Sequence, residues 1–257
     1  MVLWLALMWQ FPGQQSNLPA SIAGRVVWQG KIPALKPFLA PASPGVNQAD
    51  PGLKSWPNPM APAFGPGGEM GKVLVWLEGE AGESRSPVRV KVKDNQILVE
   101  QGGLPVPVGL MGQGDSIVVE SDQDALFTLK GRGANSFALP LLEKGKPVTR
   151  KLEKAGWVEL SSGSGQYWAR AWLWVGAPGK AVFTDMAGNF EFGALKPGKQ
   201  KIYARLPDWR IGRFERDQET GEILLAEYGK PRVEMVETEL KSGVQSRVDI
   251  VFRAGQP

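Results

Sequence analysis

The chain has 257 residues, and its 30 Lys and Arg against 26 Asp and Glu give a formal net charge of +4. It contains neither His nor Cys. These absences exclude Ser-His-Asp and Cys-His nucleophiles, and they remove the imidazole and thiolate ligands of zinc, haem and blue-copper sites. Basic residues alternate with acidic ones, which is typical of a solvated surface and not of a nucleic-acid-binding face. We therefore expect a protein that is not an enzyme, uses no cofactor and binds no nucleic acid.

The first nine residues are apolar apart from the terminal amine. They are far fewer than the roughly 20 residues that span a bilayer, so we expect no transmembrane span. We interpret residues 1–20 as the remnant of an export signal. This predicts an extracytoplasmic protein, either periplasmic, secreted or at the cell surface.

Apolar and polar residues alternate along most of the chain. In Val88–Lys93 three valines alternate with arginine and lysine, which places the valines on one face of a strand. Gly and Pro number 32 and 21, about a fifth of the chain, and punctuate these runs. Similar runs occupy 25–28, 72–77, 116–119, 125–129, 157–160, 167–175, 190–192, 201–206, 233–240 and 247–252. The pattern predicts an all-β protein with two Greek-key-type β-sandwiches.

Two segments lack this alternation. Pro33–Gly71 is rich in proline, and we expect an extended loop that lies over a sandwich. Arg213–Gly221 is densely charged, which is typical of a solvated turn at the tip of a hairpin.

Two motifs in the middle of the chain resemble cupredoxins, the plastocyanin-like copper sandwiches. Gly114–Asp122 (G-D-S-I-V-V-E-S-D) is similar to the G-D-T-V-x-x-x-N strand of that family. Val158–Ser162 followed by Gln166–Trp172 resembles its ligand loop, C-D-x-H-P-W-M-x-A-Y. The resemblance implies a cupredoxin-like sandwich over residues 81–176.

The same resemblance locates the copper ligands. It puts Ser162 at the cysteine, Gln166 at the second histidine and Ala169 at the axial methionine, while the stretch from Ala125 lacks the first histidine. A blue-copper site needs two imidazoles and a thiolate, and every one of them is lost here. The resemblance therefore implies the fold without its metal, and it argues against copper electron transfer, the family role.

Motifs on either side resemble carboxypeptidase regulatory-like (transthyretin-like) domains. Phe183–Gly198 is similar to their T-D-x-x-G-x-F-x-F-x-x-L-x-P-G-x-Y pattern, and Ala23–Gly30 and Val73–Leu77 resemble their first two strands. This implies a regulatory-like sandwich made of residues 21–80, with the proline-rich loop 33–71, and residues 177–257. The cupredoxin-like unit is then inserted in, or followed by, this immunoglobulin/transthyretin-like unit. The combination resembles secreted bacterial plastocyanin-like or methylamine-utilisation-type proteins.

Ten tryptophans are an unusually large number for this length. Trp168, Arg170, Trp172 and Trp174 share one face of the run 167–175, and we call them the Trp face. An exposed Trp face would stack on sugar rings or on a flat partner. The alternative is that this face packs against the other sandwich. An exposed platform requires at least two of the three indoles to be more than about a third exposed.

We therefore expect a non-catalytic binding or structural protein whose partner is a protein or polysaccharide of the cell envelope. A carbohydrate-binding accessory module that uses the Trp face is the alternative. A carboxylate-dependent glycosidase or lyase would need two carboxyl groups facing each other across a cleft. Asp122 and Asp124 have the spacing to share a strand face, but acids at such strand ends are typically solvated turn residues.

Overall fold

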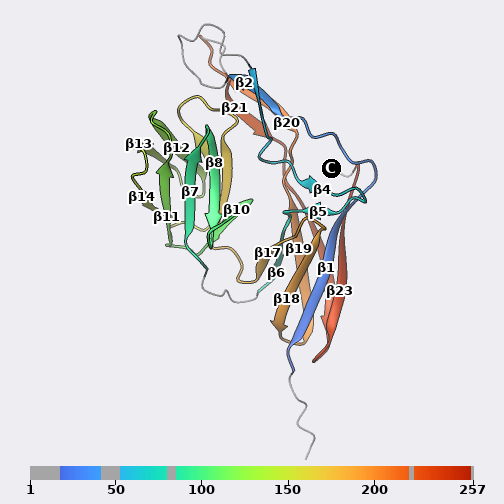
Figure 1. Cartoon of the computed structure of the whole chain (residues 1–257). Helices are drawn as coiled ribbons and strands as arrows, with labels where there is room; N and C mark the ends of the chain where they lie inside the picture. Colours follow the sequence, from blue (N-terminus) through green and yellow to red (C-terminus); the bar gives the residue numbers. More distant parts are fainter. Residues whose placement is uncertain (1–17, 42–52, 80–84, 220–222, 256–257) are drawn as a thin grey trace, which may run out of the picture.

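The protein is described by a computed structural model over residues 18–41, 53–79, 85–219 and 223–255 (Figure 1). These ranges contain β-strands and no helix, so the predicted all-β class is confirmed. The described residues include no helix long and apolar enough to cross a membrane. Apart from residues 18–20, the expected export-signal remnant lies outside the described ranges.

One sandwich, which we call the terminal sandwich, is assembled from the two outer parts of the chain. Its first sheet has the order β18-β1-β23, with β1 (Ala20–Gln29), β18 (Asn189–Leu195) and β23 (Gln245–Arg253). Its second sheet has the order β17-β6-β19-β22, with β6 (Leu74–Leu77), β17 (Ala181–Phe183), β19 (Gly198–Leu206) and β22 (Arg232–Leu240). Fully buried side chains such as Ile22, Ile202 and Phe252 fill the space between the two sheets.

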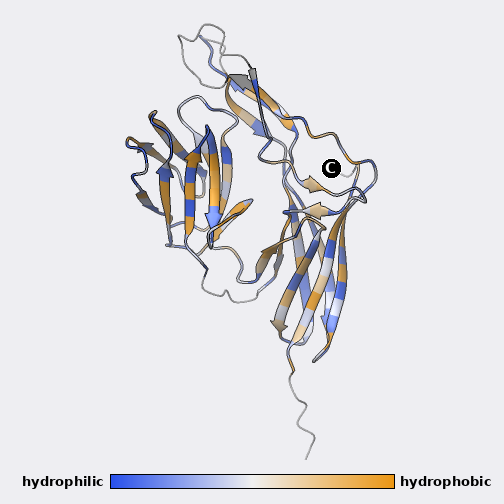
Figure 2. Cartoon of the chain, in the orientation of Figure 1, coloured by the Kyte–Doolittle hydropathy of each residue, from blue (hydrophilic) through white to orange (hydrophobic). Residues whose placement is uncertain are grey.

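Residues 88–175 form a second sandwich between β6 and β17, which we call the inserted sandwich. One sheet has the order β10-β16-β15-β12-β13, with β10 (Val108–Met111), β12 (Phe127–Gly133), β13 (Phe137–Leu141), β15 (Gly156–Ser162) and β16 (Arg170–Val175). The other has the order β14-β11-β7-β8-β9, with β7 (Val88–Lys93), β8 (Gln96–Gln101), β9 (Leu104–Pro105), β11 (Ser116–Ser121) and β14 (Val148–Lys151). The alternation of β7 is visible as blue and orange bands in Figure 2. Its three valines are at most 1% exposed, which is the burial that the sequence pattern predicts.

The proline-rich segment is not the strand-free loop that we expected. It contains β2 (Phe38–Pro41), β3 (Leu53–Trp56), β4 (Ala63–Phe64) and β5 (Met70–Gly71). β2 pairs with β3, and we call this hairpin the first arm. Phe38 and Trp56 are buried in the core of the inserted sandwich, so contacts far away in the sequence give the segment its structure.

The charged segment at 213–221 also differs from the expected solvated turn. Its first residues belong to β20 (Ile211–Arg216), which pairs with β21 (Ile223–Tyr228), and we call this hairpin the second arm. Residues 220–222 lie outside the described ranges. Ala226 of the second arm is fully buried against the inserted sandwich. Both arms thus connect the terminal sandwich to the inserted one (Figure 1).

A cluster of tryptophans joins the two sandwiches. Trp174 of β16 stacks on Trp157, with ring centroids 5.0 Å apart, and meets Trp76 of β6 edge-on at 5.1 Å. Leu74 of β6 and Val108 and Leu110 of β10 are buried in the same cluster. Large aromatic surfaces removed from water make this cluster the main apolar contact between the sandwiches.

We predict that Trp174→Ala lowers the free energy of unfolding by about 2–4 kcal/mol, because it leaves a cavity between the indoles of Trp157 and Trp76. Differential scanning calorimetry should then resolve two transitions, one for each sandwich. Leu142→Ala is the control, since Leu142 is 74% exposed. An unchanged melting profile of the Trp174 variant would show that the cluster does not couple the sandwiches.

Candidate functional site

The Trp face does not form an exposed platform. Trp168 is 3% exposed, because Trp56 of the first arm stacks on it with ring centroids 5.1 Å apart and planes 18° apart. Trp172 and Trp174 are half-buried in the cluster between the sandwiches. The alternative interpretation, packing against the other sandwich, therefore describes these two indoles. None of the three reaches the exposure that stacking on a sugar requires.

The positions that resemble copper ligands lie together at one end of the inserted sandwich. The Ser162 hydroxyl donates to the side-chain carbonyl of Gln166, and the Ala169 amide donates to the Gln166 backbone carbonyl at 3.0 Å. The Gln166 side-chain amide donates to Asn95 Oδ1 at 3.4 Å, and Gln123 donates to the same oxygen at 3.1 Å. Neutral amides and hydroxyls satisfy one another here, in place of the soft ligands that copper prefers.

The metal-binding capacity of this end follows from its residue types. The described residues contain no group of three or more His, Cys, Asp or Glu side chains that could hold a metal ion. Ser162, Gln166 and Ala169 offer one hydroxyl, one amide and a methyl group. This set does not fit a blue-copper ion.

Both arms cover this end of the inserted sandwich. The ring of Tyr167 lies 5.9 Å from Phe38 of the first arm and 6.0 Å from Phe214 of the second arm. Its hydroxyl donates to the Leu39 carbonyl at 3.3 Å. The surface around Ser162, Gln166 and Ala169 is therefore an intramolecular contact.

Arg170, the charged member of the Trp face, is buried under the second arm. The residue is 4% exposed; its guanidinium forms an ion pair with Glu159 and a 3.4 Å hydrogen bond to the Ala226 carbonyl. Its Nε and Nη1 atoms have no hydrogen-bond partner among the described residues. Burial lowers the pKa of Arg170, and the Glu159 charge partly opposes that shift.

Tyr228 of the second arm shares this environment. Its ring lies 6.1 Å from that of Trp172, and its buried hydroxyl has no partner within the described part of the chain. Burial raises the pKa of Tyr228 well above its ordinary value, because the charged phenolate would lose its hydration.

A cleft of about 790 Å³ lies between the two sandwiches and the proline-rich segment. The Trp face supplies Trp168, Arg170 and Trp172 to its wall, whereas Trp174 lies outside the lining. The terminal sandwich supplies Arg205 of β19, which no sequence motif marked. Arg205 stacks over the Trp157 ring at 3.9 Å, and burial lowers its pKa to about 10, so it remains a cation at neutral pH.

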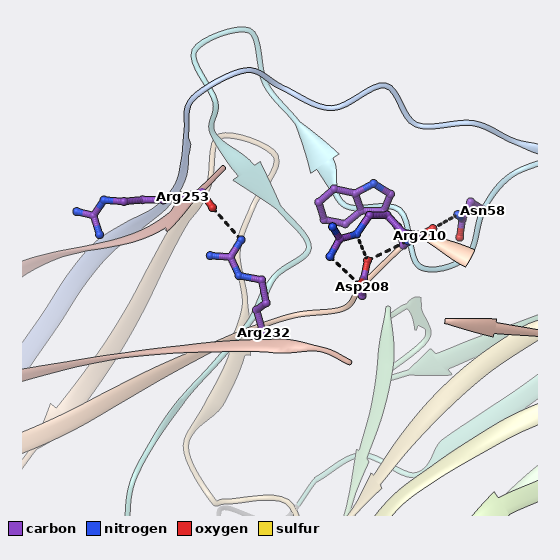
Figure 3. Close-up of polar contacts among 6 residues, drawn as sticks. Asn58, Asp208, Arg210, Arg232 and Arg253 are labelled. Atoms are coloured by element: carbon purple, nitrogen blue, oxygen red, sulfur yellow. Dashed lines mark hydrogen bonds and ion pairs between the residues drawn. The ribbon is translucent and has the colours of Figure 1, made fainter. Parts of the chain in front are cut away.

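A hydrogen bond from Asn58 anchors the proline-rich wall of this cleft, close to other polar contacts of the terminal sandwich (Figure 3). Asn58, which lines the cleft, donates its side-chain amide to the Trp209 carbonyl at 2.8 Å. Beside it, the Asp208 carboxylate accepts two hydrogen bonds of 2.9 Å from the Arg210 guanidinium. Further along the same sandwich, Arg232 donates to the Arg253 carbonyl at 2.9 Å. Of these contacts, the Asn58 bond is the one that joins the proline-rich segment to the chain that follows β19.

No family model matches the chain, and no curated protein matches it either. Several solved structures resemble it, and those described here are copper proteins. The copper-containing nitrite reductase of Thermus scotoductus SA-01 is 16% identical, with a TM-score of 0.30, over 39% of this chain and 24% of the reductase. A reduced Cu(I) amicyanin variant is 11% identical, with a TM-score of 0.29, over 39% of this chain and 97% of amicyanin.

A purple cupredoxin from Nitrosopumilus maritimus is 12% identical, with a TM-score of 0.27, over 35% of this chain and 98% of that protein. This chain spans only about a quarter of the nitrite reductase. Identities and TM-scores this low do not support assigning the function of any of these proteins to this chain.

We predict that Glu159→Ala destabilises the protein by about 2–4 kcal/mol, because it leaves the Arg170 guanidinium buried without its carboxylate. The control is Glu153→Ala, which removes an exposed pair with Lys151 and should cost less than about 1 kcal/mol. Urea unfolding measures both. Equal losses in the two variants would contradict a buried charge at Arg170.

We predict that Tyr228→Phe costs no stability at pH 7, and it gains up to about 1 kcal/mol, because the removed hydroxyl is buried without a partner. The raised pKa of Tyr228 makes the folded wild type lose stability as the pH rises above about 10, the ordinary tyrosine pKa. The variant should lack this part of the alkaline loss.

Urea unfolding at pH 7 and at alkaline pH tests this, and Tyr203→Phe is the control for the measurement at pH 7. The Tyr203 hydroxyl donates to Glu78 at 2.9 Å, so its removal should cost about 0.5–1 kcal/mol at pH 7. A comparable loss for Tyr228→Phe would indicate that the Tyr228 hydroxyl has a partner.

Proposed function

We propose that this chain is a non-catalytic binding or structural protein that works outside the cytoplasm on a metal-free cupredoxin-like sandwich. One observation carries the proposal: Ser162, Gln166 and Ala169 hydrogen-bond to one another where the resemblance puts copper ligands. A site with this chemistry does not hold copper, so electron transfer through a bound copper ion is not the role of this chain.

The non-catalytic part of the proposal rests on residue types. Without His or Cys, acid–base chemistry at neutral pH falls to carboxylates and lysines with strongly shifted pKa values. Asp122 and Asp124, the carboxylate pair noted in the sequence, are both exposed at the end of β11. They do not face each other across the cleft, whose lining contains neither.

The binding part of the proposal rests on the cleft. It collects Trp168, Arg170 and Trp172 with Arg205 in a space of about 790 Å³, which is within the usual size of small-molecule sites. The half-buried indole of Trp172 is a wall of this cleft and not a flat outer surface. The geometry therefore favours a ligand enclosed between the sandwiches over a polysaccharide chain laid across the Trp face. A cell-envelope partner on the outer surface stays part of the proposal.

We predict that incubation with Cu(II) or Cu(I) gives no intense visible band and no stoichiometric tight binding, because imidazole and thiolate ligands are missing. Absorption spectroscopy and calorimetric titration measure this, with amicyanin as the positive control. One tightly bound copper per chain would overturn the metal-free proposal.

A further inference from the structure

We propose that the cleft between the sandwiches binds a small amphipathic organic anion, with its carboxylate or phosphate group on Arg205 and its apolar body along Trp172 and Met60. The inference rests on the proposed binding function and names the ligand class of that site. Three features carry it: an unpaired cation, an excess of positive charge and a rigid apolar wall.

The unpaired cation is Arg205. No acidic side chain pairs with it in the described part of the chain, and its guanidinium stacks on Trp157. Arg205 is half-buried and lines the cleft, and its guanidinium nitrogens keep some access to solvent. A cation that has lost part of its hydration without gaining an anion gives a bound anion an unusually large electrostatic advantage.

Arg170 is the nearest competitor for this role, and it is already neutralised. Glu159 pairs with it, and its unpartnered Nε and Nη1 atoms are sealed from solvent. An anion that enters the cleft therefore meets the accessible N–H groups of Arg205. Stacking on Trp157 leaves the edge of that guanidinium available, because a stacked guanidinium keeps its in-plane donors.

The remaining charges of the lining add to the same field. Lys36 and Lys72 are exposed on the cleft wall. Asp185 is the one acid in the lining, and its carboxylate accepts hydrogen bonds from the Ala187 amide at 2.9 Å and from the Asn189 amide at 2.8 Å. Asp185 keeps its negative charge, but Lys36, Lys72 and Arg205 outnumber it, so the lining carries an excess of positive charge that favours anions over neutral ligands.

The apolar part of the wall is rigid. Met60 is 7% exposed, and Pro57, Pro59 and Pro62 flank it in a segment that Asn58 anchors to the terminal sandwich. Fixed proline backbone reduces the conformational entropy lost when a ligand binds. Trp172, which also lines the cleft, offers an aromatic surface to an alkyl or aryl chain.

The test is calorimetric titration of the full chain with three probes of one chain length: octanoate, octyl phosphate and 1-octanol. We expect octanoate or octyl phosphate to bind about tenfold or more tightly than the uncharged alcohol, because only the anions pair with Arg205. Their relative affinities distinguish a carboxylate site from a phosphate site. Octanol binding as tightly as both anions, or no binding of any probe, would overturn the inference.

Arg205→Met tests the residue, because methionine keeps an apolar stem but removes the charge. We expect anion affinity to fall about tenfold or more while octanol binding stays unchanged. The control is Arg89→Met, which removes an exposed arginine outside the cleft lining and should leave anion binding intact. Unchanged octanoate and octyl phosphate binding by Arg205→Met contradicts the role of Arg205.

Two comparisons separate failure of the anion site from a loss of stability and from failure of the proposed metal-free function. The wild-type comparison of anion with alcohol needs no variant, so it stands even where Arg205→Met loses stability through Trp157. The copper titration is independent of the anion titration. A chain that binds neither copper nor anions refutes the anion site alone, whereas a chain that binds copper refutes the metal-free function.

Discussion

The arrangement of the two sandwiches depends on the stack of Trp157 and Trp174 against Trp76. These three indoles come from β15, β16 and β6, so a single apolar cluster joins strands of both sandwiches. Arg205 closes the cluster from the side of the terminal sandwich by lying over Trp157. Leu74 and Val108 belong to this cluster and also line the cleft, as does Arg205. The site and the joint between the sandwiches are therefore one piece of structure.

The alternation of residues predicted strand faces well and partner surfaces poorly. In β7 each valine lies inside, since period two and a two-layer fold leave no other apolar surface. The same periodicity put Trp168 and Trp174 on one face, but it could not show that Trp168 meets the first arm while Trp174 meets the terminal sandwich. Those contacts join residues more than 90 positions apart, and no local pattern encodes them.

The proline-rich segment also shows that local sequence does not reveal distant contacts. Its composition favours an irregular loop, yet Phe38 and Trp56 order it by entering a core made by residues 88–175. Nothing in the sequence was a reason to single out Arg205 either, because an arginine in an alternating strand ordinarily faces solvent. Its role emerges only when β10 and β16 of the other sandwich lie against the sheet that carries it. By contrast, the absence of His and Cys is plain from the sequence, and the available side-chain chemistry limits function more directly than the fold does.

The parallel pairing of β1 with β23 has a consequence for how the protein folds. It runs from Ser21 beside Gln245 to Gln29 beside Arg253, so the terminal sandwich closes a loop of more than 200 residues. The inserted sandwich draws all ten of its strands from residues 88–175 and has far shorter loops to close. During synthesis from the N-terminus, the whole inserted sandwich has been made before β23, the parallel partner of β1, leaves the ribosome. Until β23 emerges, β1 is an unpaired strand edge on that side, which is a vulnerable state that favours misassembly and recognition by chaperones.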